Sequence, residues 1–278
     1  MPELPEVETI ARTLREGRGE VNSILGTTIE RASVLWERSI AAPSVPEFLR
    51  RIQGQVVHHI GRRGKFIVIT LTEDTLLVHL RMSGDLRVEM DGDPAMLPLK
   101  KHDRVVFYLQ GNKRLVFEDA RKFGRIWLLA DSQVELGKLG PEPLSEELTP
   151  AAFYTMLCRH KRQIKPLLMD QTFLAGLGNI YTDEALFKAK LHPLMGAQEL
   201  TSQQAGELLT AIKETLREGI KRNGASIDWV YRGGDFQNQF FVYGRKDQPC
   251  LVCGTPIERL VVGQRGTHIC PQCQMIKK

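Results

Sequence analysis

The residues with the most distinctive chemistry lie at the start of the chain, where Pro2 and Glu3 follow Met1. If Met1 is removed, as expected before a small residue, the chain begins with a secondary amine beside a carboxyl group. An α-amino group has a pKa of about 7.7–8.0, against about 10.4 for lysine, so part of it is unprotonated at neutral pH. A neutral amine can attack an electrophilic carbon such as C1′ of a nucleoside sugar and form an iminium. A proline at position 2 is common, however, and by itself usually has no function.

Four cysteines near the end of the chain form the most specific local pattern. Cys250 and Cys253 are followed, after sixteen residues, by Cys270 and Cys273, a paired spacing that is typical of a four-thiolate zinc site. Two disulfides or a redox pair are the alternatives, and a reducing cytosol disfavours disulfides. Four thiolates complete a tetrahedron, so we expect one structural Zn²⁺ and no catalytic metal.

The segment between the two cysteine pairs predicts a two-stranded hairpin with Arg265 and Gly266 near its tip. Such a finger can carry an arginine to a phosphate backbone or into an active site. A solvated arginine in a turn is the simpler alternative.

Two segments of the second half of the chain could bind phosphate. Glycines at 176 and 178 precede Asn179 and a helical pattern, and free N–H groups at a helix start can hold an anion. Upstream, 159–165 is rich in basic residues, Lys161 among them, and has no acid. A charge run of this kind is more often a solvated face than a ligand-binding strip.

The first half of the chain has three basic or mixed clusters at predicted strand ends. Lys65 follows two arginines and a glycine, and the motifs HLRMSG (79–84) and DARKFG (119–124) combine apolar and basic residues. A methionine or phenylalanine at such a position is usually part of the core. An apolar wedge beside an arginine can also fill the gap left by a nucleotide that is extruded from a duplex.

Length and charge limit the classes of protein. A chain of 278 residues should hold about two domains, and a formal net charge of +5 weakly favours a polyanionic partner such as nucleic acid. The acidic start has no signal-peptide pattern, and the longest apolar runs are far below the ~18–20 residues that span a bilayer. We therefore expect a soluble cytoplasmic protein with no membrane partner.

Periodicity divides the chain into a β-rich and an α-rich part. Apolar residues recur at helical spacing over 4–15, behind Pro2 and Glu3. A linker with one glycine and two prolines follows at 139–144, and a capping box at Thr201 and Gln204 begins a later helix that Gly224 ends. Six short runs between these helices predict an antiparallel sandwich or barrel: 66–71, 76–80, 86–90, 104–109, 114–118 and 125–129.

Short motifs run along the chain from residue 2 to Cys273: PELPEVET at the start, RRGKF, HLRMSG, KHD (101–103), DARKFG, LGPEPL, GLGNIY, VYGR (242–245) and the cysteine pairs. In these motifs the chain resembles the bacterial formamidopyrimidine-DNA glycosylase family over nearly its whole length. The resemblance implies an α+β fold with an N-terminal antiparallel β-sandwich with flanking helices (1–138), a helix-two-turns-helix domain (145–237) and a zinc finger (240–274). It also implies a monomer that binds double-stranded DNA in the cleft between its domains.

The activity that the resemblance implies is base excision repair. The family excises oxidised purines such as 8-oxoguanine and formamidopyrimidines, and then cleaves the strand by β,δ-elimination. Pro2 matches the Schiff-base nucleophile, Glu3 the proton donor, Lys65 the lysine of β-elimination and Arg265 the finger arginine of δ-elimination. The other matches are DNA contacts at His102, Arg121, Lys161 and Asn179, a wedge of Met82, Arg121 and Phe123, and a pocket carboxylate at Glu6.

The chain departs from the family pattern in the segment 223–236, where the base-capping loop is expected but a clear threonine pair is missing. This departure bears on the range of lesions. Two rival functions stay open: an endonuclease VIII-type glycosylase for oxidised pyrimidines, and a non-catalytic zinc-finger protein that binds nucleic acid. The latter gives no reason for Pro2 and Glu3 at the start.

Overall fold

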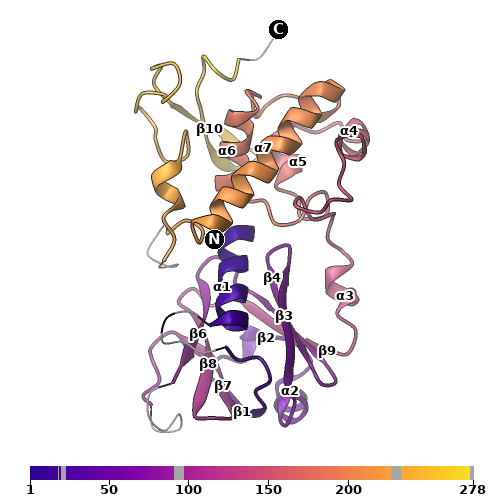
Figure 1. Cartoon of the computed structure of the whole chain (residues 1–278), viewed down its shortest axis with the longest axis vertical. Coiled ribbons are helices and arrows are strands. Elements are labelled where there is room, and N and C mark those ends of the chain that lie inside the picture. Colours follow the sequence, from indigo (N-terminus) through magenta and orange to yellow (C-terminus); the bar gives the residue numbers. More distant parts are fainter. Residues whose placement is uncertain (18, 20–22, 91–96, 227–232, 276–278) are drawn as a thin grey trace. The chain divides into compact units, whose positions relative to one another are not determined.

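The structure is a computed structural model that describes residues 1–17, 19, 23–90, 97–226 and 233–275 (Figure 1). Its contacts divide the chain into two compact units, the first holding Met1–Lys138 together with Ser226 and Gly233, and the second holding Leu139–Ala225 and the described residues from Gly234 onward. The second unit begins at the first residue of the predicted linker. The finer division into 145–237 and 240–274 stays a prediction. No helix among the described residues is long and apolar enough to cross a bilayer.

Helix α1, Leu4–Glu16, opens the first unit and confirms the helix predicted over 4–15. Val7, Ile10 and Leu14 recur at helical spacing and are buried in the core of the unit. This apolar stripe packs against strands β3 (Val57–Arg63) and β4 (Phe66–Leu71) (Figure 1). Because the stripe anchors the helix, the residues directly before it are held at a defined place.

Two sheets supply the rest of this core and confirm the predicted sandwich. The four-stranded sheet has the order β1-β7-β8-β6, and the five-stranded sheet has the order β2-β9-β5-β4-β3. All neighbours are antiparallel except β2 and β9, which run parallel. The remaining strands are β1 (Ile29–Val34), β2 (Ile40–Ala42), β5 (Thr75–His79), β6 (Gly84–Glu89), β7 (Asp103–Leu109), β8 (Lys113–Asp119) and β9 (Arg125–Leu129).

Short helices complete the first unit. They are η1 (Glu37–Ser39), α2 (Val45–Ile52) and α3 (Gln133–Leu136). The sequence patterns did not predict β1, β2, β3 or α2, whereas each of the six predicted runs falls on a strand, with ends that differ by two residues at most.

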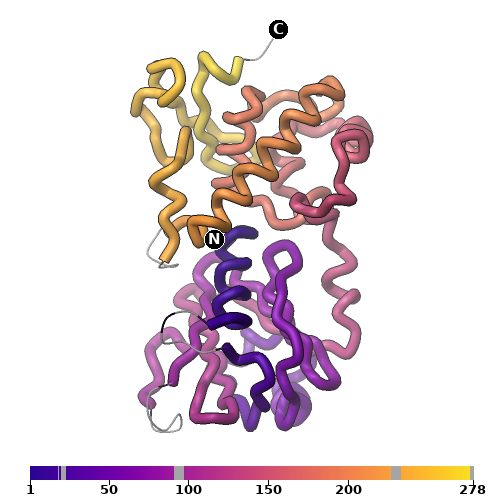
Figure 2. The backbone as a smooth tube through the Cα atoms, viewed as in Figure 1, coloured from indigo at the N-terminus to yellow at the C-terminus, as the bar shows by residue number. Residues whose placement is uncertain are grey.

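The second unit is helical and ends in a hairpin. Its helices are α4 (Pro150–Cys158), α5 (Ile164–Leu168), α6 (Asn179–Lys188), η2 (Ala197–Glu199), α7 (Ser202–Lys221) and η3 (Phe236–Gln239). The hairpin pairs β10 (Glu258–Val262) with β11 (Arg265–Ile269). In the tube of Figure 2, α7 is orange and the final segment is yellow. The hairpin was predicted, and its turn is Gly263–Gln264, directly before Arg265.

Helix α7 begins at the predicted capping box. The Thr201 hydroxyl accepts the Gln204 N–H at 3.2 Å, and the Gln204 side-chain carbonyl accepts the Thr201 N–H at 2.9 Å. Two N–H groups that have no partner within a helix are satisfied in this way. The box therefore fixes where the longest helix of the unit starts.

We predict that Thr201→Ala lowers the free energy of unfolding by about 0.5–2 kcal/mol, the range measured for lost N-caps. Thermal unfolding followed by circular dichroism should show a lower Tm. The matched control is Thr210→Ala, the same substitution at an exposed position inside α7, where the hydroxyl only donates back to the Gly206 carbonyl. Equal effects of the two substitutions would contradict the capping role.

Candidate functional site

Pro2 and Glu3 lie directly before α1, and both are buried. Glu3 is the N-cap residue in an extended conformation. The Glu6 carboxylate accepts the Glu3 N–H at 2.8 Å, and the Glu3 carbonyl accepts the Val7 N–H at 3.1 Å. The positive end of a helix favours carboxylates and disfavours a protonated amine. The structure therefore places Pro2 at the positive end of α1, beside two carboxyl groups whose negative charge acts on an amine in the opposite sense to the helix dipole.

Lys65 lies in the turn between β3 and β4 and is 4% exposed. Gly64 precedes it with a φ of +56°, a left-handed conformation that glycine adopts without steric conflict. The Arg62 guanidinium donates to the Gly64 carbonyl at 3.1 Å and to the Glu8 carboxylate of α1 at 3.1 Å. The turn that carries Lys65 is therefore fastened to the helix that follows Pro2.

His79, at the end of β5, is a neutral acceptor. Burial, with smaller contributions from the charges of Arg81 and Lys65, lowers the pKa of His79 to about 3. Its Nδ1 accepts the Arg81 N–H at 3.0 Å, and its ring meets the edge of Phe66 with the centroids 4.8 Å apart. The imidazole carries no charge near neutral pH, so it supports the loop that follows β5 and does not exchange protons there.

Met82, Arg121 and Phe123 lie on two loops of the first unit. Met82 is in the loop between β5 and β6, and the other two are in the loop between β8 and β9. The Arg121 guanidinium reaches the Met82 sulfur at 3.7 Å, and Phe123 is 54% exposed. Close by, the His102 carbonyl accepts the Asp119 N–H at 2.9 Å. Exposed apolar groups beside an arginine suit insertion into a base stack.

In the second unit the structure joins Asn179 to the hairpin. Asn179 is the first residue of α6, and its side-chain N–H donates to the Gly266 carbonyl at 2.9 Å. Gly266 directly follows Arg265, whose side chain is exposed. Lys161 is exposed in the segment between α4 and α5 and takes no part in this contact. The glycine-rich turn and the hairpin tip therefore form one surface of the second unit.

A buried ion pair that the sequence patterns did not predict holds the hairpin. Lys165 and Asp183 are fully buried, and their charged atoms are 2.6 Å apart. Lys165 also donates to the Thr267 hydroxyl at 2.7 Å, and Asp183 accepts the His268 N–H at 2.9 Å. The segment 159–165 is therefore not a uniformly solvated face. The local signal of its burial is the apolar run in which Lys165 stands, with Ile164 before it and Pro166 and Leu167 after it.

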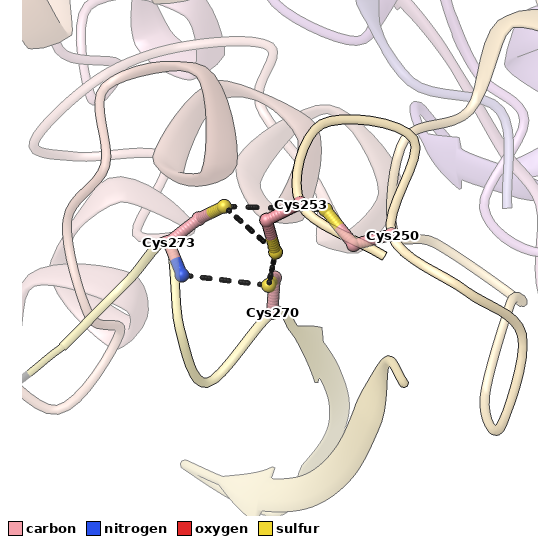
Figure 3. A group of neighbouring side chains, drawn as sticks. All are labelled: Cys250, Cys253, Cys270 and Cys273. Carbon is pink, nitrogen blue, oxygen red and sulfur yellow. Dashed lines mark hydrogen bonds between the residues drawn. The ribbon is translucent and has the colours of Figure 1, made fainter. Parts of the chain in front are cut away.

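The four cysteines of the predicted zinc site lie together (Figure 3). All four are free thiols whose sulfur atoms lie within 4.8 Å of one another. The sulfurs of Cys253 and Cys270 are 3.4 Å apart, and those of Cys250 and Cys273 are 4.0 Å apart. Zinc–sulfur bonds of about 2.3 Å require sulfurs about 3.8 Å apart in a tetrahedron. The cluster therefore fits one Zn²⁺ with no open coordination position.

The electrostatics of the cluster also suit a cation. Hydrogen bonds from Thr255 lower the pKa of the Cys253 thiol to about 6, whereas burial and the neighbouring thiols raise the pKa of Cys273. A divalent cation removes the repulsion between thiolates and stabilises all four. The predicted base-capping segment, 223–236, lies partly outside the described residues, because 227–232 do not belong to them.

Three protein-family models match the chain. The formamidopyrimidine-DNA glycosylase N-terminal domain matches residues 1–126, the formamidopyrimidine-DNA glycosylase H2TH domain matches residues 139–230, and a zinc finger found in FPG and IleRS matches residues 247–275. Together with the structure, these matches confirm the predicted α+β fold and its zinc finger.

Curated relatives and solved structures match over the whole chain. Proteins named formamidopyrimidine-DNA glycosylase from Brevibacillus brevis and Bacillus subtilis are 44% and 40% identical, each over at least 99% of both chains. A structure of the Lactococcus lactis protein with DNA containing FAPY-dG is 35% identical, with a TM-score of 0.89 over 99% of this chain and 100% of that one. A structure of MutM with DNA containing carbocyclic 8-oxo-G gives the same values.

We predict that Cys253→Ser reduces the zinc content from about one ion per chain to a small fraction of that value, because a serine hydroxyl is a poor replacement for a thiolate ligand. Metal analysis of the purified protein measures the effect. Cys158→Ser is the matched control, since Cys158 is also an exposed free thiol but lies outside the cluster. A full zinc content in the Cys253 variant would contradict the site.

Proposed function

Because the chain belongs to the formamidopyrimidine-DNA glycosylase family, we propose that it excises oxidised purines from double-stranded DNA and cleaves the strand at the resulting site. The observation that carries the proposal is the position of Pro2, which lies at the positive end of α1 beside the buried carboxyl groups of Glu3 and Glu6. We propose that the protein acts as a monomer in the cytoplasm, on damaged bases such as 8-oxoguanine and formamidopyrimidines.

The first step uses Pro2 after removal of Met1. The secondary amine attacks C1′ of a flipped nucleotide, the new C1′–N bond forms and the bond from C1′ to the base breaks. The base leaves with a proton, and Glu3 assists its departure. Burial and the helix dipole favour the neutral form of the amine, which is the reactive one, whereas ionised Glu3 and Glu6 favour the protonated form. Glu6 lines the same pocket and orients Glu3 through the Glu3 N–H.

The second stage cleaves the strand. The C1′–O4′ bond of the sugar ring then breaks, O4′ takes up a proton, and the adduct becomes an iminium at C1′. The iminium acidifies the C2′ proton, so that loss of this proton expels the 3′ phosphate and a further elimination expels the 5′ phosphate. We propose that Lys65 and Arg265 position or protonate the phosphate leaving groups of the two eliminations. Lys65 is held by the turn that Arg62 fastens to α1, and Arg265 by the hairpin that Asn179 contacts.

DNA binding involves residues of both units. We propose that His102, Arg121, Lys161 and Asn179 contact the phosphate backbone, and that Met82, Arg121 and Phe123 occupy the space of the extruded nucleotide. Binding should weaken steeply with salt, because each phosphate contact releases counterions. The zinc supports the hairpin of Arg265 and has no part in the chemistry.

Borohydride reduction tests the covalent step. We predict that wild-type protein becomes trapped on a duplex with one 8-oxoguanine, and that Pro2→Gly reduces trapping at least about tenfold, because the secondary amine is the nucleophile. The control is Pro46→Gly, an exposed proline in the first turn of α2, which should trap as wild type does. Unchanged trapping by a variant with extra residues joined before Pro2 would refute the assignment.

Defined lesions test the substrate class. We predict faster excision of 8-oxoguanine and formamidopyrimidines than of thymine glycol, because the relatives whose structures match were solved with modified purines. A nicking assay on duplexes with one lesion opposite each of the four bases measures the preference. Preferred excision of thymine glycol would favour the endonuclease VIII-type function, and binding without nicking would favour a non-catalytic protein.

A further inference from the structure

We propose that Asp119 is a positioning residue, which holds the two loops of the wedge in the arrangement that enters the duplex. The inference rests on the proposed function, because it concerns how Met82, Arg121 and Phe123 replace an extruded nucleotide. Asp119 ends β8 and is fully buried, so it cannot touch DNA itself. Its effect on the wedge has to pass through the groups that it binds.

The Asp119 carboxylate joins one loop to the other. One oxygen accepts the hydroxyl of Ser83, which follows Met82, and also the Arg121 N–H at 3.1 Å. The second oxygen accepts the Gly124 N–H at 2.7 Å. The Ser83 hydroxyl lies 3.0 Å from the Arg121 N–H as well. Three donors from two loops therefore converge on one buried charge, and charge-assisted hydrogen bonds of this kind are the strong ones.

Close packing leaves little freedom around this carboxylate. A Cβ at Gly124 would lie 2.4 Å from the ring of Phe117, and one at Gly84 would lie 2.5 Å from the Leu80 carbonyl oxygen. Both distances are too short for a side chain. Gly124 therefore packs closely on Phe117 of β8, and Gly84, the first residue of β6, packs closely on Leu80, at the start of the loop that carries Met82.

The loop of Arg121 is held from a second side. Lys122 has a φ of +62°, and its ammonium group lies 3.9 Å from the centroid of the Trp36 ring. The Arg104 guanidinium donates to the Asp119 carbonyl at 2.7 Å. Arg121, Lys122 and Phe123 are all exposed, and of these three Lys122 is directed to Trp36. The Lys122 ammonium group and the Asp119 carbonyl of this loop are both bound within the protein, and the wedge residues Arg121 and Phe123 stay exposed.

A carboxylate is required at this position, and its isosteric amide is not equivalent. Asparagine has the same shape, but its NH₂ group can only donate and would face the N–H of Gly124 in one orientation and the N–H of Arg121 in the other. One of the three hydrogen bonds is then replaced by a contact between two donors, which is costly in a buried place. In the asparagine variant the two loops lose their fixed geometry. The wedge then becomes ordered only as it enters the DNA, and this step costs conformational entropy.

Two duplexes that differ at one nucleotide test the inference. One carries 8-oxoguanine opposite cytosine, and the other carries a preformed abasic site, which has no base to unpair and unstack. We expect Asp119→Asn to slow base excision by about tenfold, the order that follows from losing two ordered groups, and to slow strand cleavage at the abasic site by much less. The ratio of the two rates is the readout, and a general loss of stability does not change it.

Ser83→Ala should shift the ratio of base excision to strand cleavage in the same direction by a smaller factor. This variant tests the inference if Asp119→Asn does not fold. Asp74→Asn is the matched control, because Asp74 is a buried carboxylate of the same unit that accepts hydrogen bonds from Arg51 and Gln55, at the opposite end of β5. An unchanged ratio in both wedge variants, or an equal shift in the control, overturns the inference. A wild-type protein that acts on neither duplex would instead refute the proposed function.

Discussion

Backbone N–H groups that turns and helix ends leave without a partner need an acceptor when they are buried, and here buried carboxylates supply it. Glu6 accepts the N–H that follows Pro2, and Asp119 accepts two from the loop of Arg121 and Phe123. Asp183 accepts one from β11, and Glu184 accepts three from Phe241 to Tyr243 at 2.8–3.0 Å. Glu6, Asp119 and Glu184 each fix an irregular segment on a regular element, and Asp183 joins strand β11 to helix α6.

This constraint has an energetic side. Burial raises the pKa of Glu184, although hydrogen bonds from three N–H groups favour its charged form. Ionised Glu184 therefore has an unfavourable desolvation energy, which the three hydrogen bonds offset only in part. The pair of Lys165 and Asp183 is similar, since removal of one partner of a buried ion pair typically costs about 3–5 kcal/mol. Substitution of such a carboxylate therefore affects first the segment that it binds, and the hydrophobic core only indirectly.

Much of the fold could be predicted from the sequence, because regular elements with one buried face produce a periodic pattern. Helix α1 and strands β4 and β9 are examples. The missed strands β1 and β3 are edge strands of their sheets and carry many polar residues. Strand β1 is extended because it pairs with β7, which is distant in the sequence, so no local pattern reveals it. Strand β3 forms a hairpin with β4, the next strand along the chain, but its two histidines and two arginines hide the apolar pattern of a strand.

In the candidate site, too, local motifs could be predicted from the sequence, whereas contacts between distant residues could not. The cysteine spacing and the short motifs were readable because each lies within a few residues, and Pro2 was readable from its position alone. Asp119 lies inside a recognised motif, but its role depends on Ser83, 36 positions away in the sequence. The partners of Lys165 are 18 and 102 positions away. Contacts of this kind need the folded chain.

The setting of Pro2 has a consequence for when the protein can act. While Met1 is joined to it, the Pro2 nitrogen belongs to a tertiary amide, whose lone pair is delocalised into the carbonyl group. Under the proposed mechanism this lone pair must attack C1′, so the protein can act only after an aminopeptidase has removed the initiator methionine.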